Sequence, residues 1–286
     1  MDGIVIVDKP AGWTSQDVTA RLRRVFATRR IGHGGTLDPM ATGVLPVFVG
    51  RATRAVEFFE HAEKRYEAGL LLGVTTDTED TTGTVLEERD VSATDGQIEE
   101  TLQRFRGQIQ QIPPMYSAVK IGGQKLCNLA RKGKEVERPV RTVTIFDLTL
   151  LGREENTLFL RVHCSKGTYI RTLCKDIGDA LGCGGCMASL RRTAAGAYTI
   201  GQAVPLEELL KSGTPERYLQ PVDSLFLDYP ALRVTANQEK CCRNGAAFSL
   251  TAPEGLYRVY GRSGEFLMLG RVSGGVMQTV KSFFTV

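Results

Sequence analysis

Apolar and polar positions follow one another along the chain in a way that predicts many short strands and a few amphipathic helices. Strand-like segments rich in valine, leucine and aromatic residues span 3–8, 44–49, 64–74, 84–88, 141–151 and 157–164. Apolar residues at helical spacing predict helices that begin at Ser15 and that span 95–105 and 169–181. Because paired strands outnumber regular strand-helix-strand units, we expect an α+β fold built on a mixed, mainly antiparallel sheet.

Local signals mark where some of these elements begin and end. Ser15 is the expected N-cap of the first helix, because a serine side chain accepts a hydrogen bond from the free N–H groups of a helix start. Val18, Leu22 and Val25 then fall on one face of that helix. The Gly122-Gly123 pair predicts a turn.

The last part of the chain has a different pattern. After Pro230, strand-like segments at 255–260, 265–271 and 276–281 are separated by glycine and serine turns. We therefore expect two domains, a large catalytic domain over 1–229 and a small β-rich domain over 230–286.

Composition excludes several classes of protein. The chain is 42% hydrophobic, yet no apolar run approaches the roughly 18 residues of a membrane span, and no basic leader precedes one. We expect a cytoplasmic protein that does not bind a membrane. Seven cysteines, an odd number in a long chain, indicate reduced thiols. Cys183 and Cys186 have C-x-x-C spacing, but no second pair repeats it, so we expect no metal site.

Charge is distributed unevenly around a net value of +4. Between residues 76 and 100 there are nine acidic residues against the single Arg89. Basic residues gather instead in 20–54, 120–141 and 161–192. If these three segments share a face, they form a surface that neutralises phosphates, and the acidic segment lies away from the ligand. The alternative is an ordinary solvated surface.

A glycine-rich stretch over 32–43 contains the most informative acid of the chain. Asp38 is the only acidic residue among seven arginines between residues 20 and 54. One carboxylate in a cationic stretch suggests chemistry on a polyanion. The alternative is that Asp38-Pro39 is simply a turn, since both residue types favour turn geometry.

Common nucleotide and hydrolase motifs are absent. Leu37 stands where a dinucleotide fingerprint starting at Gly32 would need its third glycine, and no G-x-x-x-x-G-K-[ST] or G-x-S-x-G occurs. We therefore expect no cofactor. The remaining possibility is a reaction that a carboxylate, an arginine and a tyrosine carry out by themselves.

Several ordered blocks resemble the TruB family of pseudouridine synthases. They are Asp8-Lys9-Pro10-x-Gly12-x-Thr14-Ser15, Gly32-His33-Gly34-Gly35-Thr36-Leu37-Asp38-Pro39, Lys64-Arg65-Tyr66, Pro113-Pro114-Met115-Tyr116-Ser117-Ala118-Val119-Lys120, Leu129-Ala130-Arg131 and Ser165-Lys166-Gly167-Thr168-Tyr169-Ile170-Arg171. The resemblance implies an isomerase of uridine 55 in the T loop of tRNA, with a C-terminal PUA-like RNA-binding domain. Because the chain has no long basic tail, we also expect a stand-alone monomer that needs no guide RNA.

The resemblance assigns roles to particular residues. It implies that Asp38, Tyr66 and Arg171 are catalytic. It implies that the remaining site residues bind the substrate, namely His33, Tyr169, Leu190, Lys9, Lys64, Arg131 and Lys132. Within that set, His33 would fill the space of the flipped-out base and the four basic residues would contact phosphates. The family often has threonine where this chain has Gly34, which indicates a differently shaped loop around His33.

The chemistry of pseudouridine formation fits these residue types. The N1–C1′ bond breaks, the uracil turns, and a C5–C1′ bond forms. Asp38 could attack C1′, add to the base, or remove the 2′ proton to give a glycal, and the sequence leaves all three open. Arg171 would favour the charged form of Asp38 by an ion pair. Tyr66 would stack on the base and is a candidate to accept the C5 proton.

Two other functions use some of the same features. A non-catalytic tRNA-binding or tRNA-folding protein needs the basic segments but has no use for Asp38, Tyr66 and Arg171 together. A glycosidase or nucleoside-cleaving enzyme needs a second carboxylate as a general acid, and no motif supplies one.

Overall fold

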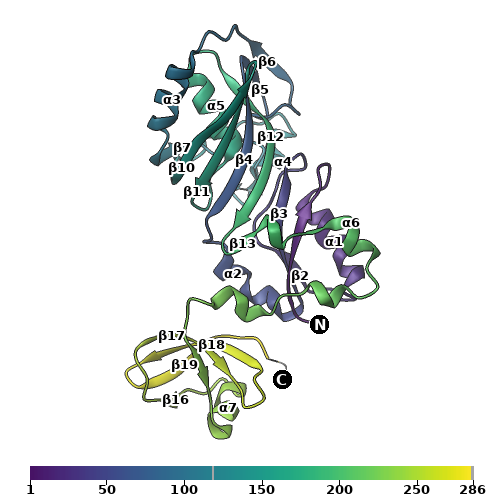
Figure 1. Cartoon of the computed structure of the whole chain (residues 1–286), viewed down its shortest axis with the longest axis vertical. Helices are drawn as coiled ribbons and strands as arrows, with labels where there is room; N and C mark the ends of the chain where they lie inside the picture. Colours follow the sequence, from purple (N-terminus) through teal and green to yellow (C-terminus); the bar gives the residue numbers. More distant parts are fainter. Residues whose placement is uncertain (118, 285–286) are drawn as a thin grey trace.

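The computed structural model describes residues 1–117 and 119–284, which fold around a ten-stranded and a five-stranded sheet (Figure 1). Neighbouring strands of the large sheet follow the order β14-β1-β3-β12-β4-β11-β10-β7, with β2 on β3 and β13 on β12. These strands are β1 (Gly3–Lys9), β2 (Ile31–His33), β3 (Thr42–Val49), β4 (Lys64–Leu72), β7 (Gly107–Gln111), β10 (Arg141–Glu154), β11 (Thr157–Cys164), β12 (Gly185–Ala195), β13 (Tyr198–Thr199) and β14 (Val204–Pro205). Among the described strands of this sheet, only β1–β14 and β3–β12 pair in parallel, so the expected mixed, mainly antiparallel sheet is confirmed.

Helices cover one face of this sheet. The longer ones are α1 (Ser15–Val25), α3 (Asp95–Arg104), α5 (Ile170–Ala180) and α6 (Leu206–Lys211), and short ones are α2 (Val56–Phe59) and α4 (Leu126–Ala130). Apolar side chains of α1, α3, α5 and α6 share one core with the sheet. Strands β1 and β3 are buried on both faces, because α2 and the C-terminal domain cover the other side. This explains why these two strands are continuously apolar.

The start of α1 differs from the expectation by one residue. The N-cap is Thr14, whose hydroxyl accepts from the N–H of Asp17, while the Asp17 side chain accepts from the N–H of Thr14. This reciprocal pair is a capping box. Ser15 is the first helical residue, it is buried, and its hydroxyl is used elsewhere.

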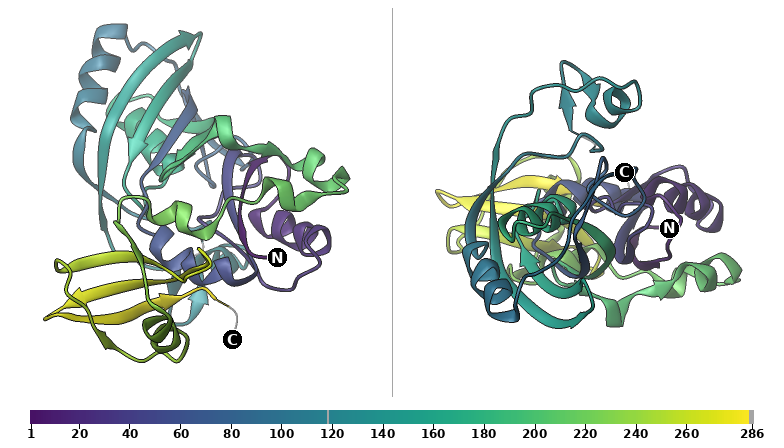
Figure 2. Two further views of the ribbon diagram at one scale, coloured as in Figure 1. Left: turned by 60° about the horizontal axis from the view of Figure 1, so that its bottom comes forward. Right: turned by 90° about the horizontal axis from the view of Figure 1, so that it is seen from above.

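Two segments leave the main sheet near α5. A hairpin of β5 (Val74–Thr76) and β6 (Val85–Glu88) encloses a loop over 77–84. Residues 112–140 form an arm that holds β8 (Lys120–Ile121), β9 (Gln124–Lys125) and α4, and it projects from the body in the right view of Figure 2. The expected turn at Gly122-Gly123 joins β8 and β9. Ala118, within the motif block 113–120, lies outside the described residues.

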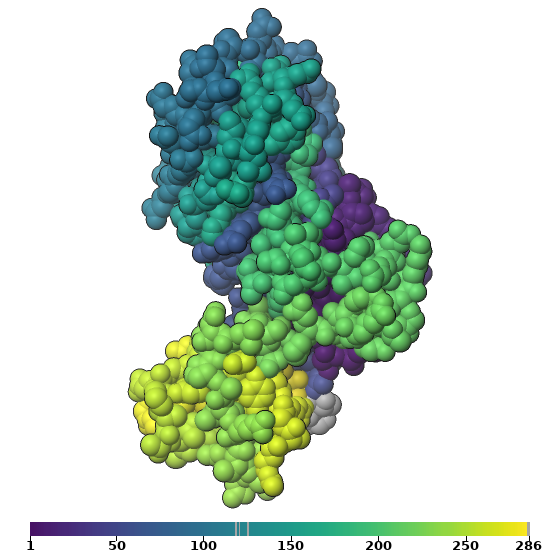
Figure 3. Space-filling view, viewed as in Figure 1, coloured from purple at the N-terminus to yellow at the C-terminus, as the bar shows by residue number. Residues whose placement is uncertain are grey.

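The C-terminal part contains the β-rich unit that the sequence predicts. It is made of β15 (Ala231–Arg233), α7 (Ala236–Arg243), β16 (Phe248–Ser249), β17 (Gly255–Tyr260), β18 (Phe266–Ser273) and β19 (Val276–Ser282). Figure 3 shows it as a lobe beneath the body, against the green segment that precedes it. Phe226 of that segment contacts Phe266 and Phe283 of the lobe, so the two parts share apolar packing. The domain boundary at 229/230 stays a prediction.

None of the helices within the described ranges has the length and apolar character that a membrane span requires.

Candidate active site

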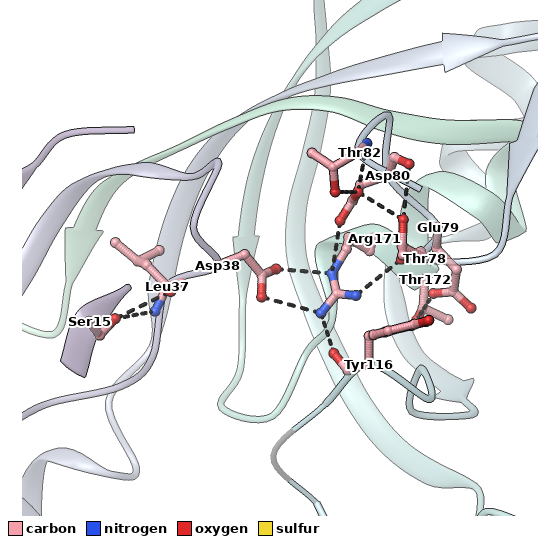
Figure 4. Close-up of polar contacts among 10 residues, drawn as sticks. All are labelled: Ser15, Leu37, Asp38, Thr78, Glu79, Asp80, Thr82, Tyr116, Arg171 and Thr172. Atoms are coloured by element: carbon pink, nitrogen blue, oxygen red, sulfur yellow. Dashed lines mark hydrogen bonds and ion pairs between the residues drawn. The ribbon is translucent and has the colours of Figure 1, made fainter. Parts of the chain in front are cut away.

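The loop between β2 and β3 carries Asp38 and is anchored on both sides of that residue, and Figure 4 shows the anchor that precedes it. Before it, the N–H of Leu37 donates to the buried Ser15 hydroxyl at 2.9 Å. After it, the carbonyl of Pro39 accepts from the N–H of Gly12 at 2.8 Å. These bonds tie the loop to the start of α1, so the Asp38 carboxylate is presented from a fixed backbone.

Lys9 is a third anchor of the same loop. Its ammonium donates to the carbonyls of Pro10 at 2.9 Å, Trp13 at 2.7 Å and Pro39 at 3.2 Å. The residue is fully buried, and this burial lowers the pKa of the amine to about 8. An ammonium has three protons, and all three are used here. The structure therefore corrects the expectation that Lys9 contacts phosphate: its place is inside the loop.

Arg171, near the start of α5, holds Asp38 through a two-point contact. Its Nε donates to Asp38 Oδ2 at 2.9 Å and its Nη2 donates to Oδ1 at 3.3 Å. Further bonds run from Nη1 to the carbonyl of Thr78 at 3.1 Å and from Nη2 to that of Tyr116 at 2.9 Å. Arg171 is only 5% exposed, whereas the Asp38 side chain is 34% exposed. The expected ion pair is present, and only its carboxylate half faces open space.

Asp80 is a second carboxylate beside Arg171 that the sequence analysis did not single out. Its Oδ2 lies 3.8 Å from Arg171 Nε. Its Oδ1 accepts from the hydroxyl of Thr78 at 2.9 Å and from the N–H of Thr82 at 3.0 Å. The acidic segment over 76–100 was expected to lie away from the ligand. This was wrong for the loop over 77–84, which folds onto Arg171. Asp38 and Asp80 face one common guanidinium.

Tyr66 projects from β4 into the same core region and is 8% exposed. Burial raises the pKa of its hydroxyl, and the positive charge of the neighbouring Arg192 partly opposes that rise. The phenol therefore stays protonated near neutral pH. The Asp38 charge is close enough to raise the pKa of Tyr66 further.

Arg192 on β12 is a buried cation that the sequence analysis also missed. It is 1% exposed and donates to the carbonyls of Val44 at 2.7 Å and Gly35 at 3.1 Å. It therefore braces the Asp38 loop from the side of β3. Its neighbour Arg191 pairs with Asp8 at 2.8 Å, so at this end of the expected basic segment 161–192 one arginine is buried and the other is part-exposed and paired.

Tyr169 and Leu190 lie on two elements next to these residues, at the start of α5 and on β12. Tyr169 is the N-cap of α5, and the buried Gln111 fixes its backbone by accepting from its N–H at 3.1 Å and donating to its carbonyl at 3.2 Å. Leu190 is 7% exposed on β12 and belongs to the same apolar cluster as Tyr66.

His33 ends β2, next to Gly34. Its Nδ1 is buried with no hydrogen-bond partner among the described residues, and burial lowers the pKa of the ring, as does the charge of Arg192. Gly34 is explained by packing. A Cβ there would lie 2.4 Å from Phe59 Cδ1, because the Phe59 ring occupies the space that a side chain at this position would need.

The three other basic residues expected to bind the substrate differ in how far they are buried. Lys64 begins β4 and donates to the carbonyl of Ala62, and burial lowers the pKa of its amine to about 8. It lies beside Gly35, within the site. Arg131 and Lys132 are exposed on the projecting arm, and no described contact joins them to Asp38.

The cysteine pair that raised the question of a metal lies where β12 begins. Cys183 is buried and its thiol donates to the carbonyl of Gly184 at 3.4 Å, while burial raises the pKa of Cys186 to about 11. Within the described ranges, no group of three histidine, cysteine or acidic side chains has the geometry to hold a metal ion.

Comparison with known proteins identifies the family. The model of the TruB family pseudouridylate synthase N-terminal domain matches residues 23–170, and that of the tRNA pseudouridylate synthase B C-terminal domain matches 171–227. The chain belongs to the TruB family of pseudouridylate synthases. It is therefore an enzyme that isomerises uridine to pseudouridine. The two matches meet inside the site, since Asp38 lies in the first and Arg171 opens the second.

Similar proteins cover nearly the whole chain. tRNA pseudouridine synthase B of Ectopseudomonas mendocina (strain ymp) is 46% identical over 283 residues, which is 96% of this chain and 92% of that protein. The enzyme of the same name from Clostridium kluyveri is 41% identical over 99% of this chain and 100% of its own length. Among solved structures, a Cbf5-Nop10-Gar1 complex aligns with a TM-score of 0.74 at 27% identity, covering 99% of this chain and 85% of that one.

Proposed function

We propose that this TruB family enzyme converts uridine 55 in the T loop of tRNA to pseudouridine, with Asp38 as the reacting group. The observation that carries the proposal is the two-point Asp38–Arg171 contact, in which the arginine is buried and the carboxylate is one-third exposed. Such a carboxylate is held in one orientation and can still reach a sugar or base. tRNA enters the proposal through the names of the relatives and through the TruB motif blocks.

The uridine has to leave its stack for Asp38 to reach N1, C1′ or C5. In the proposal its base lies against Tyr66, with Tyr169 and Leu190 in the wall around it. Because Tyr66 is a protonated phenol with a flat ring, it provides a stacking platform and a hydroxyl that can relay the C5 proton. Attack at C1′, addition to the base and glycal formation all remain routes for Asp38.

Contacts with RNA beyond the reacting uridine are inferred from the exposure and charge of each residue. We infer that His33 fills the space of the flipped base, and that Lys64, Arg131 and Lys132 contact phosphates. Lys9 has no place in this list, because its protons are used inside the loop. We also infer a cytoplasmic monomer that acts without a guide RNA, in contrast to the H/ACA complexes among its structural relatives.

Tritium release from C5 tests the substrate assignment. The unaltered protein is mixed with an unmodified tRNA transcript that carries C5-tritiated uridines, and with a transcript in which uridine 55 is cytidine. We expect near-stoichiometric release, one tritium per transcript, from the first RNA and none from the second. Equal release from both would place the reaction at another uridine, and no release from either would contradict the activity on tRNA.

A further inference from the structure

A hollow on the exposed side of α1 lies next to the catalytic loop and has no part in the site described above. Its volume is about 460 Å³, and it is lined by Gly12, Trp13, Asp17, Ala20, Arg21 and Arg24. The lining residues of α1 recur at helical spacing, so they form one face, opposite to the face that Val18 and Leu22 bury. In Figure 1, α1 lies at the edge of the body beside α6, and this face points away from the sheet.

Trp13 is an aromatic platform in this hollow. The residue is half-buried and packs against the main core, and the Arg21 guanidinium lies 5.9 Å from its ring centroid. The backbone of Trp13 is fixed to the catalytic loop, since Lys9 donates to the carbonyls of both Trp13 and Pro39. An RNA strand whose nucleotide reaches Asp38 therefore has this platform within reach of its neighbouring nucleotides.

The charges around Trp13 suit a phosphate. Arg21 and Arg24 are exposed, and no carboxylate of the described residues forms an ion pair with either. Asp17 also lines the hollow, but its carboxylate accepts from both the N–H and the hydroxyl of Thr14 at the start of the helix. The Asp17 carboxylate is thus engaged at the start of the helix, while Arg21 and Arg24 have no carboxylate partner among the described residues.

We propose that this hollow is a second RNA-binding site, which takes an unpaired nucleotide of the substrate other than the target uridine. The base stacks on Trp13, and the phosphate beside it binds Arg21 and Arg24. Arg21 leaves the ring face when the base arrives, because an exposed cation–π contact is weak and a phosphate contact replaces it. The inference rests on the proposed function only in taking tRNA as the ligand.

Trp13 is the only tryptophan of the chain, so its fluorescence reports on this site alone. An unmodified tRNA transcript is titrated into the Asp38→Asn protein, so that binding is followed without turnover, and a filter assay measures affinity in parallel. We expect emission to be quenched in step with binding. Inorganic polyphosphate is expected to leave the emission unchanged, because it lacks a base. Unchanged emission at saturating tRNA, or equal quenching by polyphosphate, would overturn the proposal.

Substitutions test the same site through affinity. Trp13→Leu keeps an apolar side chain but removes the platform, and we expect tRNA affinity to fall about tenfold, the lower end of the range for loss of one stacked base. Trp13→Phe keeps a ring and is expected to stay within about threefold. Arg24→Gln is expected to weaken binding by about threefold to tenfold.

Substitutions of other exposed arginines distinguish binding at this hollow from a general electrostatic attraction between the protein and tRNA. Arg104→Gln removes the same charge from another exposed helical position and is expected to leave affinity unchanged. If Arg29→Gln, outside the hollow but in the same basic stretch, weakened binding as much as Arg24→Gln, the specific site would be refuted. Tritium release by the unaltered protein is scored separately, so failure of the proposed reaction and failure of this site are distinguishable.

Discussion

At the scale of single residues, the site is a carboxylate surrounded by buried cations that hold it from three directions. Arg171 contacts the Asp38 side chain, Lys9 holds the carbonyl that follows it, and Arg192 holds the carbonyl of Gly35. None of these three cations is more than 5% exposed. The three cations therefore hold Asp38 and its loop in place.

Lys9→Met tests this positioning role. Methionine keeps most of the length of the side chain but removes the Lys9 donor from the carbonyls of Pro10 and Trp13 and leaves that of Pro39 with the N–H of Gly12. We therefore expect the unfolding free energy to fall by at least about 2 kcal/mol. The rate of tritium release should fall as well, while tRNA affinity stays within about threefold. Urea unfolding and filter binding measure the two effects. Unchanged stability together with weakened affinity would restore the phosphate-contact role.

Asp80→Asn tests the second carboxylate. Asparagine can still accept from Thr78 and Thr82, but the charge beside Arg171 is lost. We expect the guanidinium to shift toward Asp38 and the single-turnover rate to fall about 10-fold to 100-fold, the scale of a small misplacement of a catalytic group. Affinity for tRNA is expected to change by less than about threefold. A rate within threefold of the unaltered protein would show that Asp80 does not position Arg171.

At the scale of elements, segments with a regular apolar pattern were predictable from the sequence. Strand β12, which completes the site, was not. Strands β1, β3 and β11 and helices α3 and α5 match the predicted segments within two residues at each end. The central strand β12 went unrecognised. Its register shifts between Met187 and Ser189 and between Arg192 and Ala194, so the bulges break the alternation of period two by which strands are read.

The site residues were also only partly predictable, because some of them are placed by tertiary contacts and not by a local pattern. Asp38, Tyr66 and Arg171 lie in motif blocks, and the ion pair between Asp38 and Arg171 was expected from the sequence, while their catalytic roles stay a prediction. Asp80 lies in an acidic segment whose total charge suggested solvent, and only the fold of the 77–84 loop onto Arg171 shows its place. Lys9 was misplaced because a lysine in a basic protein suggests phosphate, whereas tertiary contacts surround it with carbonyls. A possible signal for Asp80 is the threonine two residues away on each side.

The stability of the protein depends on pH through a carboxylate in the last turns of helix α5. Burial raises the pKa of Asp176 to about 6, against 3.8 in an unfolded chain, and its side chain is 31% exposed. Between these two values the folded state binds more protons than the unfolded state, so stability falls as pH rises through this window. Above pH 6 the half-buried carboxylate is charged and costs free energy.

Asp176→Asn should remove that cost. We expect the variant to be more stable than the unaltered protein by about 1–2 kcal/mol at pH 7.5, discounted for the solvent-exposed part, and equal to it near pH 4. Urea midpoints at the two pH values measure the difference. Asp179→Asn, whose carboxylate pairs with Lys175 at 2.7 Å, is the control and should show no such gain. A gain that is equal at both pH values would refute the linkage.

At the scale of the whole molecule, the C-terminal lobe and the body share a core. Phe226 precedes the lobe, is 2% exposed, and has ring contacts with Phe58 of the body and with Phe266 and Phe283 of the lobe. The Tyr260 hydroxyl donates to Asp223 at 2.5 Å across the same junction. These contacts indicate that the lobe unfolds together with the body.

Phe226→Ala should weaken that coupling. Removal of the ring leaves a cavity between the two parts, and we expect a loss of about 3–5 kcal/mol in unfolding free energy. Calorimetry should then show two transitions in place of the single one of the unaltered protein. Val280→Ala, at an exposed position on β19, is the control and should keep one transition. Two transitions already present in the unaltered protein would contradict a shared core.

In the proposed mechanism Asp38 performs the chemistry while other residues hold the RNA. Single-turnover tritium release at saturating tRNA by the unaltered protein and by Asp38→Asn, with affinity measured on the same samples, separates these two roles. We expect the rate to fall by at least about 1000-fold, while affinity stays within about tenfold, or 1.4 kcal/mol. Turnover retained in Asp38→Asn would show that Asp38 is not the reacting group.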